Sequence, residues 1–299
     1  MTAGYHLPDG ACWGSPLLTP RERRAKAVLE EIFAHKGSLI LPGFKFSQVI
    51  RRRPPGVSGE QWGYATRAHF DFVVCDAETY IPDFAVELDD ASHRRPDARR
   101  RDRMKDAVCE AASFDLLRID SRALDYGPRG RRLVEYLIDA RECFRAFGEA
   151  QERGDVPPDE IGDYRLIIDQ GGFVNDLAGP ARRRALQAFQ AGSVEGRAIE
   201  GLHFDWKDGW AEAWAWLQVR GDFYLFEQAR LRSYHFHCGI GSGNLAEDLA
   251  VAAVGELLPR LGDDTPILVR RDDMARRLTR LREQREELEF AIMLDHTQF

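Results

Sequence analysis

Residues 69–119 read HFDFVVCDAETYIPDFAVELDDASHRRPDARRRDRMKDAVCEAASFDLLRI. Two runs rich in β-branched and aromatic residues, HFDFVVC and DFAVELD, flank a polar stretch that ends at Pro82, so they predict a hairpin. A strand places residues i and i+2 on one face, so Glu87 and Asp89 project together, and pairing brings Asp71 beside them. We therefore expect the apolar side chains to pack inward on one face and the three acids to open on the other.

A basic segment follows the second strand. His93 comes directly after the strand, and Pro96 indicates the first turn of a helix whose apolar stripe includes Met104 and Val108. Beyond this helix, FDLLRI predicts a short buried strand. With Lys105 the arginines of the segment form a local cationic patch in a chain of net charge −7. These arginines are Arg94, Arg95, Arg99, Arg100, Arg101 and Arg103.

Acids grouped on one sheet face repel one another unless a positive charge lies among them. Mg²⁺, or Mn²⁺ as its substitute, is a hard cation that prefers such oxygen ligands, and arginines suit the phosphates of a nucleic acid. The pattern therefore predicts a metal site at Asp71, Glu87 and Asp89, beside a phosphate-binding helix. Solvated acids at a sheet edge and a solvated basic helix face remain the plainer alternatives.

The linked motifs of residues 17–120 resemble the PD-(D/E)XK restriction-endonuclease-like superfamily. Within it the chain is similar to a branch of unknown function with a signature close to DFV-C-D…IELDD-SH-RPD…RD…KD…AG-LLRI, and very-short-patch-repair endonucleases are more distant relatives. LLTPRE at 17–22 and ILPGFKFSQVI at 40–50 fit the N-terminal part of that branch. The resemblance implies an α/β core with a mixed sheet, metal-dependent hydrolysis of phosphodiester bonds, and a nucleic acid as substrate.

One motif departs from the superfamily pattern. Its second motif usually reads Glu-x-Lys, where the lysine helps to position the attacking water, but here Asp89 stands in the lysine's place. The resemblance implies that Asp71 and Glu87 hold Mg²⁺ and that Asp89 is a further ligand or an acid behind the metal. Lys105 could supply the amine from the helix, or His93 could carry protons instead.

Asp102 lies where the same branch tends to place an aspartate. A structural clamp and a catalytic role both remain open for it.

Five cysteines lie scattered without a CxxC pair, which indicates a reducing compartment. No apolar run reaches 18 residues, so we expect a cytoplasmic protein without membrane contact.

Two interpretations of function follow from these observations. The leading one is a Mg²⁺-dependent endonuclease that acts on DNA in preference to RNA, in repair or in defence against foreign nucleic acid. The alternative is a degenerate nuclease fold that has lost its chemistry and uses the basic helix to bind nucleic acid or a protein partner. Binding by such a module would persist without metal and weaken steeply with salt.

The chain is long enough for two domains. We expect an irregular arm over 1–16, a nuclease-like α/β domain over 17–150, a linker over 151–163, and an α+β domain with a small antiparallel sheet over 164–299. In the first domain, the resemblance implies a restriction-endonuclease-like mixed sheet flanked by helices. Helices are expected at 20–35, 129–149, 180–191, 245–258 and 272–294, strand-like runs at 38–50, 211–219, 222–229 and 232–238, and a basic loop at 51–64.

The second half carries no grouping of acids, so we expect self-association or substrate engagement there rather than hydrolysis. Apolar residues at alternating four- and three-residue steps in the last helix predict either a seam for a homodimer or a helix lying on its own domain. They are Met274, Leu278, Leu281, Leu288 and Ile292.

Four tryptophans favour a core or a protein interface over base stacking. They are Trp206, Trp210, Trp214 and Trp216. Asn244 and Glu247 form a capping pattern. The pair His235 and His237 and the turn GIGSGN are weak signals of metal and anion binding.

Overall fold

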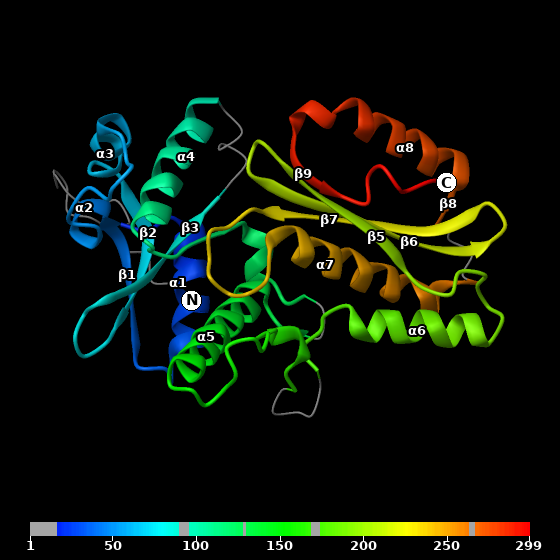
Figure 1. Cartoon of the computed structure of the whole chain (residues 1–299), viewed down its shortest axis with the longest axis horizontal. Coiled ribbons are helices and arrows are strands. Elements are labelled where there is room, and N and C mark those ends of the chain that lie inside the picture. Colours follow the sequence, from blue (N-terminus) through cyan, green and yellow to red (C-terminus); the bar gives the residue numbers. More distant parts are fainter. Residues whose placement is uncertain (1–16, 90–95, 128–129, 169–173, 263–266) are drawn as a thin grey trace, which may run out of the picture.

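The computed structural model describes residues 17–89, 96–127, 130–168, 174–262 and 267–299. Two sheets lie side by side along the long axis of the molecule, one in each half of the chain (Figure 1). The first sheet has the strand order β1-β2-β3-β4. Its strands are β1 (Ser38–Lys45), β2 (His69–Asp76), β3 (Pro82–Leu88) and β4 (Leu116–Ile119). The first three pair antiparallel and β4 runs parallel to β3, so the expected mixed sheet is present.

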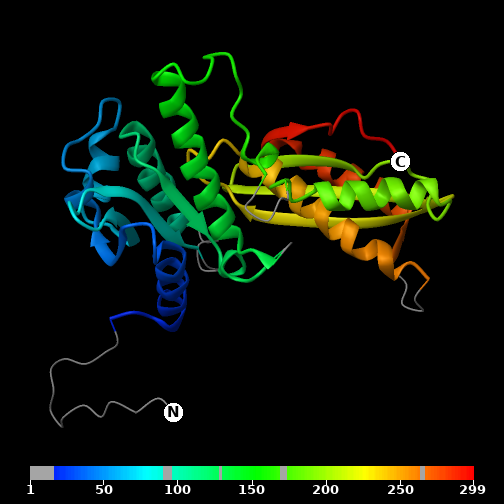
Figure 2. The ribbon, with the colours of Figure 1, turned by 90° about the horizontal axis from the view of Figure 1, so that it is seen from below.

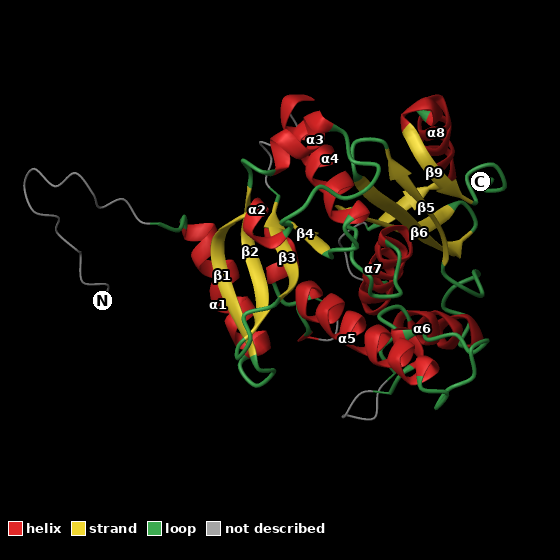
Figure 3. Cartoon of the chain, turned by 60° about the vertical axis from the view of Figure 1, so that its left-hand side comes forward, coloured by secondary structure: helices red, strands yellow, loops and turns green. Residues whose placement is uncertain are grey.

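Helices cover both faces of the first sheet (Figure 3). One face packs against α1 (Pro20–Phe33) and α5 (Leu133–Glu152), and the other against α3 (Gly59–Ala65) and α4 (Pro96–Ala111). A short helix, α2 (Phe46–Val49), follows β1. A parallel pair such as β3 and β4 needs a crossover, and here α4 provides it.

Local capping explains where these helices begin. Thr19 and Glu22 form a capping box at the start of α1, and Pro20 occupies its first turn. Ser58 and Gln61 form a second box at the start of α3. The expectation of a loop over 51–64 is therefore wrong in its last part, because this Ser-x-x-Gln signal initiates a helix within a polar stretch.

The expected division of the hairpin into an apolar face and an open acidic face is wrong. Phe72 and Val86 pack toward α1 and α5, but Val73 and Ala85 on the opposite face are also fully buried. Helices α3 and α4 cover that second face, as is usual where a sheet contains a parallel crossover. The acids therefore lie beneath a helix rather than on an open surface, and Glu87 is only 6% exposed.

The second sheet is antiparallel with the order β8-β7-β6-β5-β9. Its strands are β5 (Glu200–Trp206), β6 (Trp210–Arg220), β7 (Phe223–Arg232), β8 (Leu268–Arg270) and β9 (Leu288–Ile292). Helices α7 (Ser242–Leu257) and α6 (Gly179–Gln190) lie on one face, as the view from below shows (Figure 2), and α8 (Arg271–Glu283) lies on the other.

Strand β6 shows why the two faces differ. Ala211, Ala213 and Ala215 face α7, and these small side chains let the helix approach the sheet closely. Trp214 and Trp216 alternate with them and pack against α8 in the second core. These two tryptophans therefore belong to the core, which was the favoured interpretation.

The last predicted helix is too long, and the seam through it is wrong. Helix α8 ends at Glu283, and Leu288–Ile292 form β9 because they pair with the free edge of β5. Met274, Leu278 and Leu281 are buried against their own sheet, which confirms the alternative of a helix lying on its own domain. Self-association through another surface of this half stays a prediction.

Three further expectations in the second half need correction. Residues 232–238 do not form a strand, since β7 ends at Arg232 and His235 makes only an isolated bridge to Leu116 of β4. The pattern also missed β5 and β8. Asn244 does not cap α7, because that helix begins earlier, after Gly241.

One apolar core runs through both halves. The rings of Phe236 and of Phe84 in β3 pack edge to face, with their centres 5.2 Å apart. Leu177 belongs to the same apolar cluster as Leu137 of α5. Helix α5 continues to Glu152, into the expected linker. Separate folding of residues 164–299 stays a prediction, and the shared core argues against it. Within the described ranges, no helix has the length and apolar content needed to span a bilayer.

A pair of glycines tests the close packing of α6 on α7. A Cβ on Gly255 would lie 2.3 Å from Cβ of Ala181, whereas a Cβ on Gly148 of α5 would meet no atom within 4 Å. We expect Gly255→Ala to lower the free energy of unfolding by about 1–3 kcal/mol. Gly148→Ala should raise it by up to about 1 kcal/mol, because alanine is the better helix former. Urea denaturation measures both, and equal effects would contradict the close approach.

Candidate active site

The candidate site lies where β2 begins and β3 ends. Phe72 pairs with Val86, so the next residues along the hairpin, Asp71 and Glu87, lie across from each other. The backbone N–H of Leu88 donates to Oδ2 of Asp71 at 2.7 Å, which fixes this carboxylate against the neighbouring strand. The hairpin therefore brings together the two acids that the sequence placed on adjacent strands.

Lys105 reaches the same point from α4. Its Nζ donates to Oε1 of Glu87 at 2.6 Å and to the backbone oxygen of His69 at 2.9 Å. Both side chains of the ion pair are buried, at 8% and 7% exposed. The Phe70 ring lies 5.5 Å below the ammonium group. A lysine distant in sequence thus supplies an amine beside the second carboxylate.

Burial governs the protonation of both acids. It raises the pKa of Glu87 to about 7, although the positive charge of Lys105 opposes this. Burial also raises the pKa of Asp71, and the negative charges of Glu22 and Asp89 add to the effect, whereas the Leu88 N–H and Lys105 oppose it. The site therefore concentrates negative charge in a poorly solvated place, where a bound cation would be stabilising.

Glu22 is a site neighbour that the sequence did not single out. It lies in the first turn of α1, where Oε2 accepts a hydrogen bond from the Thr19 N–H at 2.6 Å, and its charge acts on Asp71. The Thr-x-x-Glu pattern indicated only a helix start. No signal in the sequence showed that this helix start would lie beside the hairpin.

Asp89 points into a different environment from Glu87. Its carboxylate accepts from Nη1 of Arg118 at 3.2 Å and from Nε of Arg232, one guanidinium on each oxygen. It is 2% exposed. This arrangement does not suit a direct metal ligand and fits the other reading, an acid behind the metal. Asp102 lies 3.6 Å from the same Arg118, which favours the structural clamp.

The residues present fit a magnesium ion held by two carboxylates. Mg²⁺ commonly keeps several waters and binds through one or two protein carboxylates together with substrate phosphates. Asp71 and Glu87 would supply these two, each through the oxygen not engaged by Leu88 or Lys105. In the described part of the chain, no group of three or more His, Cys, Asp or Glu side chains could hold a metal. His93 lies outside the described residues.

The basic helix places some of its arginines near this site. Arg94 and Arg95 lie outside the described residues, as does the side chain of Arg99. Arg100, Arg101 and Arg103 are exposed on α4, and Arg101 lies one helical turn before Lys105. A depression of about 380 Å³ on this surface is lined by Glu60, Tyr64, Arg67, Arg100, Arg101 and Met104.

A second opening lies between the two halves, beside α4. This cleft of about 730 Å³ is lined by Arg103 and by residues of the C-terminal half. These are Trp206, Lys207, Asp208, Arg230, Gln284, Glu286 and Glu287. Cations and acids are mixed along it, so the cleft is less suited to a polyanion than the surface around Arg101.

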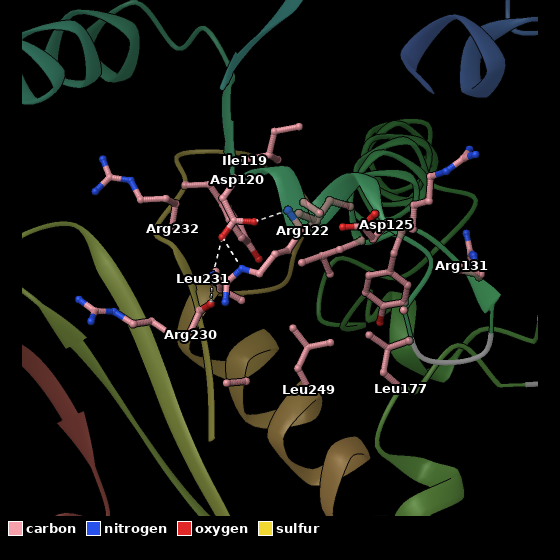
Figure 4. Close-up of a pocket in the computed structure, with 18 of the residues that line it drawn as sticks. Ile119, Asp120, Arg122, Asp125, Arg131, Leu177, Arg230, Leu231, Arg232 and Leu249 are labelled. Carbon is pink, nitrogen blue, oxygen red and sulfur yellow. Dashed lines mark hydrogen bonds and ion pairs between the residues drawn. The ribbon is translucent and has the colours of Figure 1, made fainter. Parts of the chain in front are cut away.

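A cavity of about 310 Å³ lies between the two halves and is lined in part by residues of β4 and β7 (Figure 4). Among its polar side chains, Arg122 pairs with Asp120 and donates to the backbone oxygen of Arg230 at 3.0 Å. Leu177, Leu231 and Leu249 form the apolar wall. The residues that line the cavity include no acid–lysine pair, and two of them, Arg118 and Arg232, also bind Asp89 of the candidate site.

The weak signals of the C-terminal half stay apart from the candidate site. The ring of His237 pairs with Asp115 at the start of β4, and His235 is exposed. Gly243 packs so closely on His203 that a Cβ would lie 2.6 Å from its ring, so the glycine-rich turn serves helix packing.

Comparison with known proteins adds one finding. A family described as a protein of unknown function (DUF2726) matches residues 14–132. The matched stretch contains Asp71, Glu87, Asp89 and Lys105 and ends at the start of α5, so it leaves the C-terminal half outside. No curated protein and no solved structure matches the chain.

Proposed function

We propose that the chain is a metal-dependent nuclease of the PD-(D/E)XK restriction-endonuclease-like class, which hydrolyses phosphodiester bonds of DNA in preference to RNA. One observation carries the proposal: Nζ of Lys105 lies 2.6 Å from Oε1 of Glu87. The linear motif lacks the lysine expected two residues after the glutamate, and the fold supplies an amine from α4 instead. The mixed sheet flanked by helices agrees with the fold that the resemblance implies.

Each residue of the site has a distinct role in this proposal. Asp71 and Glu87 would hold Mg²⁺, which would supply an activated water and offset the charge that develops on the phosphate. Lys105 has three N–H donors, of which Glu87 and His69 engage two among the described residues, and the third would bind an oxygen of the substrate or the attacking water. The negative charge of Glu22 would help to raise the pKa of Asp71.

The exposed arginines of α4 would hold the substrate. A guanidinium binds phosphate oxygens in a two-pronged manner, and Arg101 lies one turn from Lys105 on the same helix. The phosphodiester backbone would thus run across the start of α4. Such contacts carry no base specificity by themselves.

The direct test is a cleavage assay on the purified full chain with Mg²⁺ or Mn²⁺. Single-stranded, linear duplex and circular DNA should be offered, together with RNA, with EDTA as the matched control. We expect cleavage of DNA that requires the metal. A protein that cuts none of these substrates under any of these conditions is not the proposed nuclease.

Replacing Lys105 tests the observation that carries the proposal. Lys105→Met keeps the length of the side chain but removes its charge, so Glu87 loses its partner and a transition-state donor disappears. We expect the cleavage rate to fall by at least about a hundredfold. Lys36→Met is the matched control, because Lys36 also forms ion pairs, with Asp139 and Glu142, but nearer the surface and away from the site. An active Lys105→Met protein would argue against this role.

The second candidate function is a binding module without chemistry. The observation that favours it is the buried ion pair itself, because Lys105 already offsets the charge of Glu87 without any metal. Calorimetry with Mn²⁺ separates the two functions. Heat of binding that disappears in Glu87→Gln supports the enzyme, and absence of heat with intact nucleic-acid binding supports the module.

Salt dependence tests the arginine surface under either function. In EDTA, a triple change of Arg100, Arg101 and Arg103 to glutamine should weaken duplex binding and reduce the slope of log K against log salt by roughly 2–3. The matched control changes Arg276, Arg277 and Arg280, three exposed arginines of α8 on the C-terminal half, in the same way. Equal losses from the two triple variants would mean that α4 is no dedicated phosphate surface.

A further inference from the structure

We propose that Arg232, at the end of β7 in the C-terminal sheet, is a positioning residue of the candidate active site. It holds Asp89, and through Asp89 it fixes the end of β3 that carries Glu87 and Leu88. The site is then incomplete without the C-terminal half of the chain. The kinetic part of this inference rests on the proposed function, whereas its structural part does not.

The backbone N–H, the backbone oxygen and the carboxylate of Asp89 each make a hydrogen bond. Its N–H donates to the backbone oxygen of Ile119 at 2.8 Å, which continues the pairing of β3 with β4. Its backbone oxygen accepts from Arg21 of α1. Its carboxylate lies between Arg118 of β4 and Arg232 of β7. Arg232 is the contact among these that comes from the C-terminal half.

Arg232 is itself held rigidly by its own half. Its Nη1 donates to the backbone oxygen of Asp208 in the β5–β6 turn at 3.1 Å, and its guanidinium lies 5.4 Å from the centre of the Trp210 ring. It is 7% exposed. A charged hydrogen bond in such a buried place is strong and strongly directional. The β5–β6 turn therefore sets where Arg232 places Asp89.

The position of Asp89 bears on both metal-binding candidates. The residue before it, Leu88, donates its N–H to Asp71, and the residue before that is Glu87. A shift of Asp89 would therefore move the hydrogen bond to Asp71 and the carboxylate of Glu87 together. Misplacement of about 1 Å at a reacting centre costs roughly a hundredfold in rate.

Arg122 provides a matched control. It also crosses between the halves, because Nη2 donates to the backbone oxygen of Arg230 in β7 at 3.0 Å. Its side chain is 66% exposed and its acid partner is Asp120, which is not part of the site. Arg122→Gln thus removes a contact between the halves without touching Asp89.

The experiment compares Arg232→Gln, Arg232→Lys and Arg122→Gln in the full chain, well below the unfolding temperature of each protein. The first readout is amide hydrogen exchange at Leu88 and Asp89. The second is the split between kcat and KM for Mg²⁺-dependent cleavage of duplex DNA.

We expect the Leu88 and Asp89 amides of Arg232→Gln to exchange at least about tenfold faster than in the wild type, with α1 and β1 unchanged. The kcat should fall by about 10–100-fold with KM within about twofold, and Arg232→Lys should recover part of it. Arg122→Gln should match the wild type in both readouts.

Two results would overturn the inference. One is unchanged exchange at Leu88 and Asp89 in Arg232→Gln. The other is faster exchange spread evenly over the first half, which would indicate general destabilisation. A wild type that cleaves no nucleic acid would count against the proposed function, and the exchange data would still decide the role of Arg232.

Discussion

Glu87→Gln and Asp71→Asn should each lower Mg²⁺-dependent cleavage by at least about a thousandfold. Both variants remove a negative charge where a divalent cation would bind, and metal-assisted charge stabilisation supplies several kcal/mol of transition-state energy. A loss of about 4 kcal/mol corresponds to about a thousandfold in rate. The effect should appear in kcat/KM for cleavage of DNA and, in calorimetry, in the affinity for Mn²⁺.

The fold should survive both changes, because each new side chain keeps an acceptor oxygen. The amide oxygen of Gln can accept from Nζ of Lys105, and that of Asn can accept from the Leu88 N–H. Burial raises the pKa of both carboxyl groups, so the neutral side chain is tolerated there. The unfolding temperature of Asp71→Asn should therefore stay close to that of the wild type, whereas that of Glu87→Gln should fall, because the buried ammonium group of Lys105 loses its counter-charge.

Glu78→Gln is the matched control for these two variants. Glu78 is an exposed acid in the turn that joins β2 to β3, at the end of the hairpin away from the site. The Glu78→Gln protein should cleave DNA at the wild-type rate. Cleavage that persists in Glu87→Gln or Asp71→Asn would place the catalytic metal elsewhere, or show that the activity came from a contaminant.

The sequence predicted the parts of the site that local periodicity determines. The alternation within HFDFVVC and DFAVELD placed Asp71 and Glu87 on neighbouring strands, and the pattern after Pro96 indicated the helix that carries Lys105. The spacing left open whether Lys105 or another group would reach Glu87, because the angle at which a helix packs on a sheet depends on the core beneath it. Val108 and Cys109 of α4 supply that core here.

Contacts between segments distant in sequence were not predictable in the same way. Arg232 is separated from Asp89 by 143 residues, and nothing in the run RSYHFHC shows that its first residue faces an acid of the other half. The same run looked like a strand, but in the structure β7 ends at Arg232 and the run forms an isolated bridge between His235 and Leu116 of β4. Strand-like composition alone does not create a partner.

A charged residue within a short apolar run indicates a buried ion network. Arg118 interrupts the short buried strand LLRI, where an unpaired charge would be very costly. Its presence there already implied acids close by. The structure supplies them as Asp89, Asp102 and Asp106.

Arg118→Met should lower the free energy of unfolding by about 3–5 kcal/mol, the typical cost of removing one partner from a buried ion network. Arg118 has a 2% exposed side chain, and its guanidinium binds Asp106 at 2.8 Å and Asp89 at 3.2 Å. Without it, Asp89 keeps Arg232, but Asp106 loses a buried cation and the group of acids gains net negative charge. Methionine fills a similar volume, so the loss would be electrostatic rather than a cavity.

Urea denaturation of Arg118→Met measures this loss, with Arg122→Met as the matched control. Arg122 pairs with Asp120 at the surface, where an ion pair contributes at most about 1 kcal/mol, so its loss should be small. The double variant Arg118→Met with Asp106→Asn should recover part of the stability, because one of the uncompensated carboxylates is then gone. Strictly additive losses in the double variant would mean that Arg118 acts through packing, and that the charge network does not join α4 to β4.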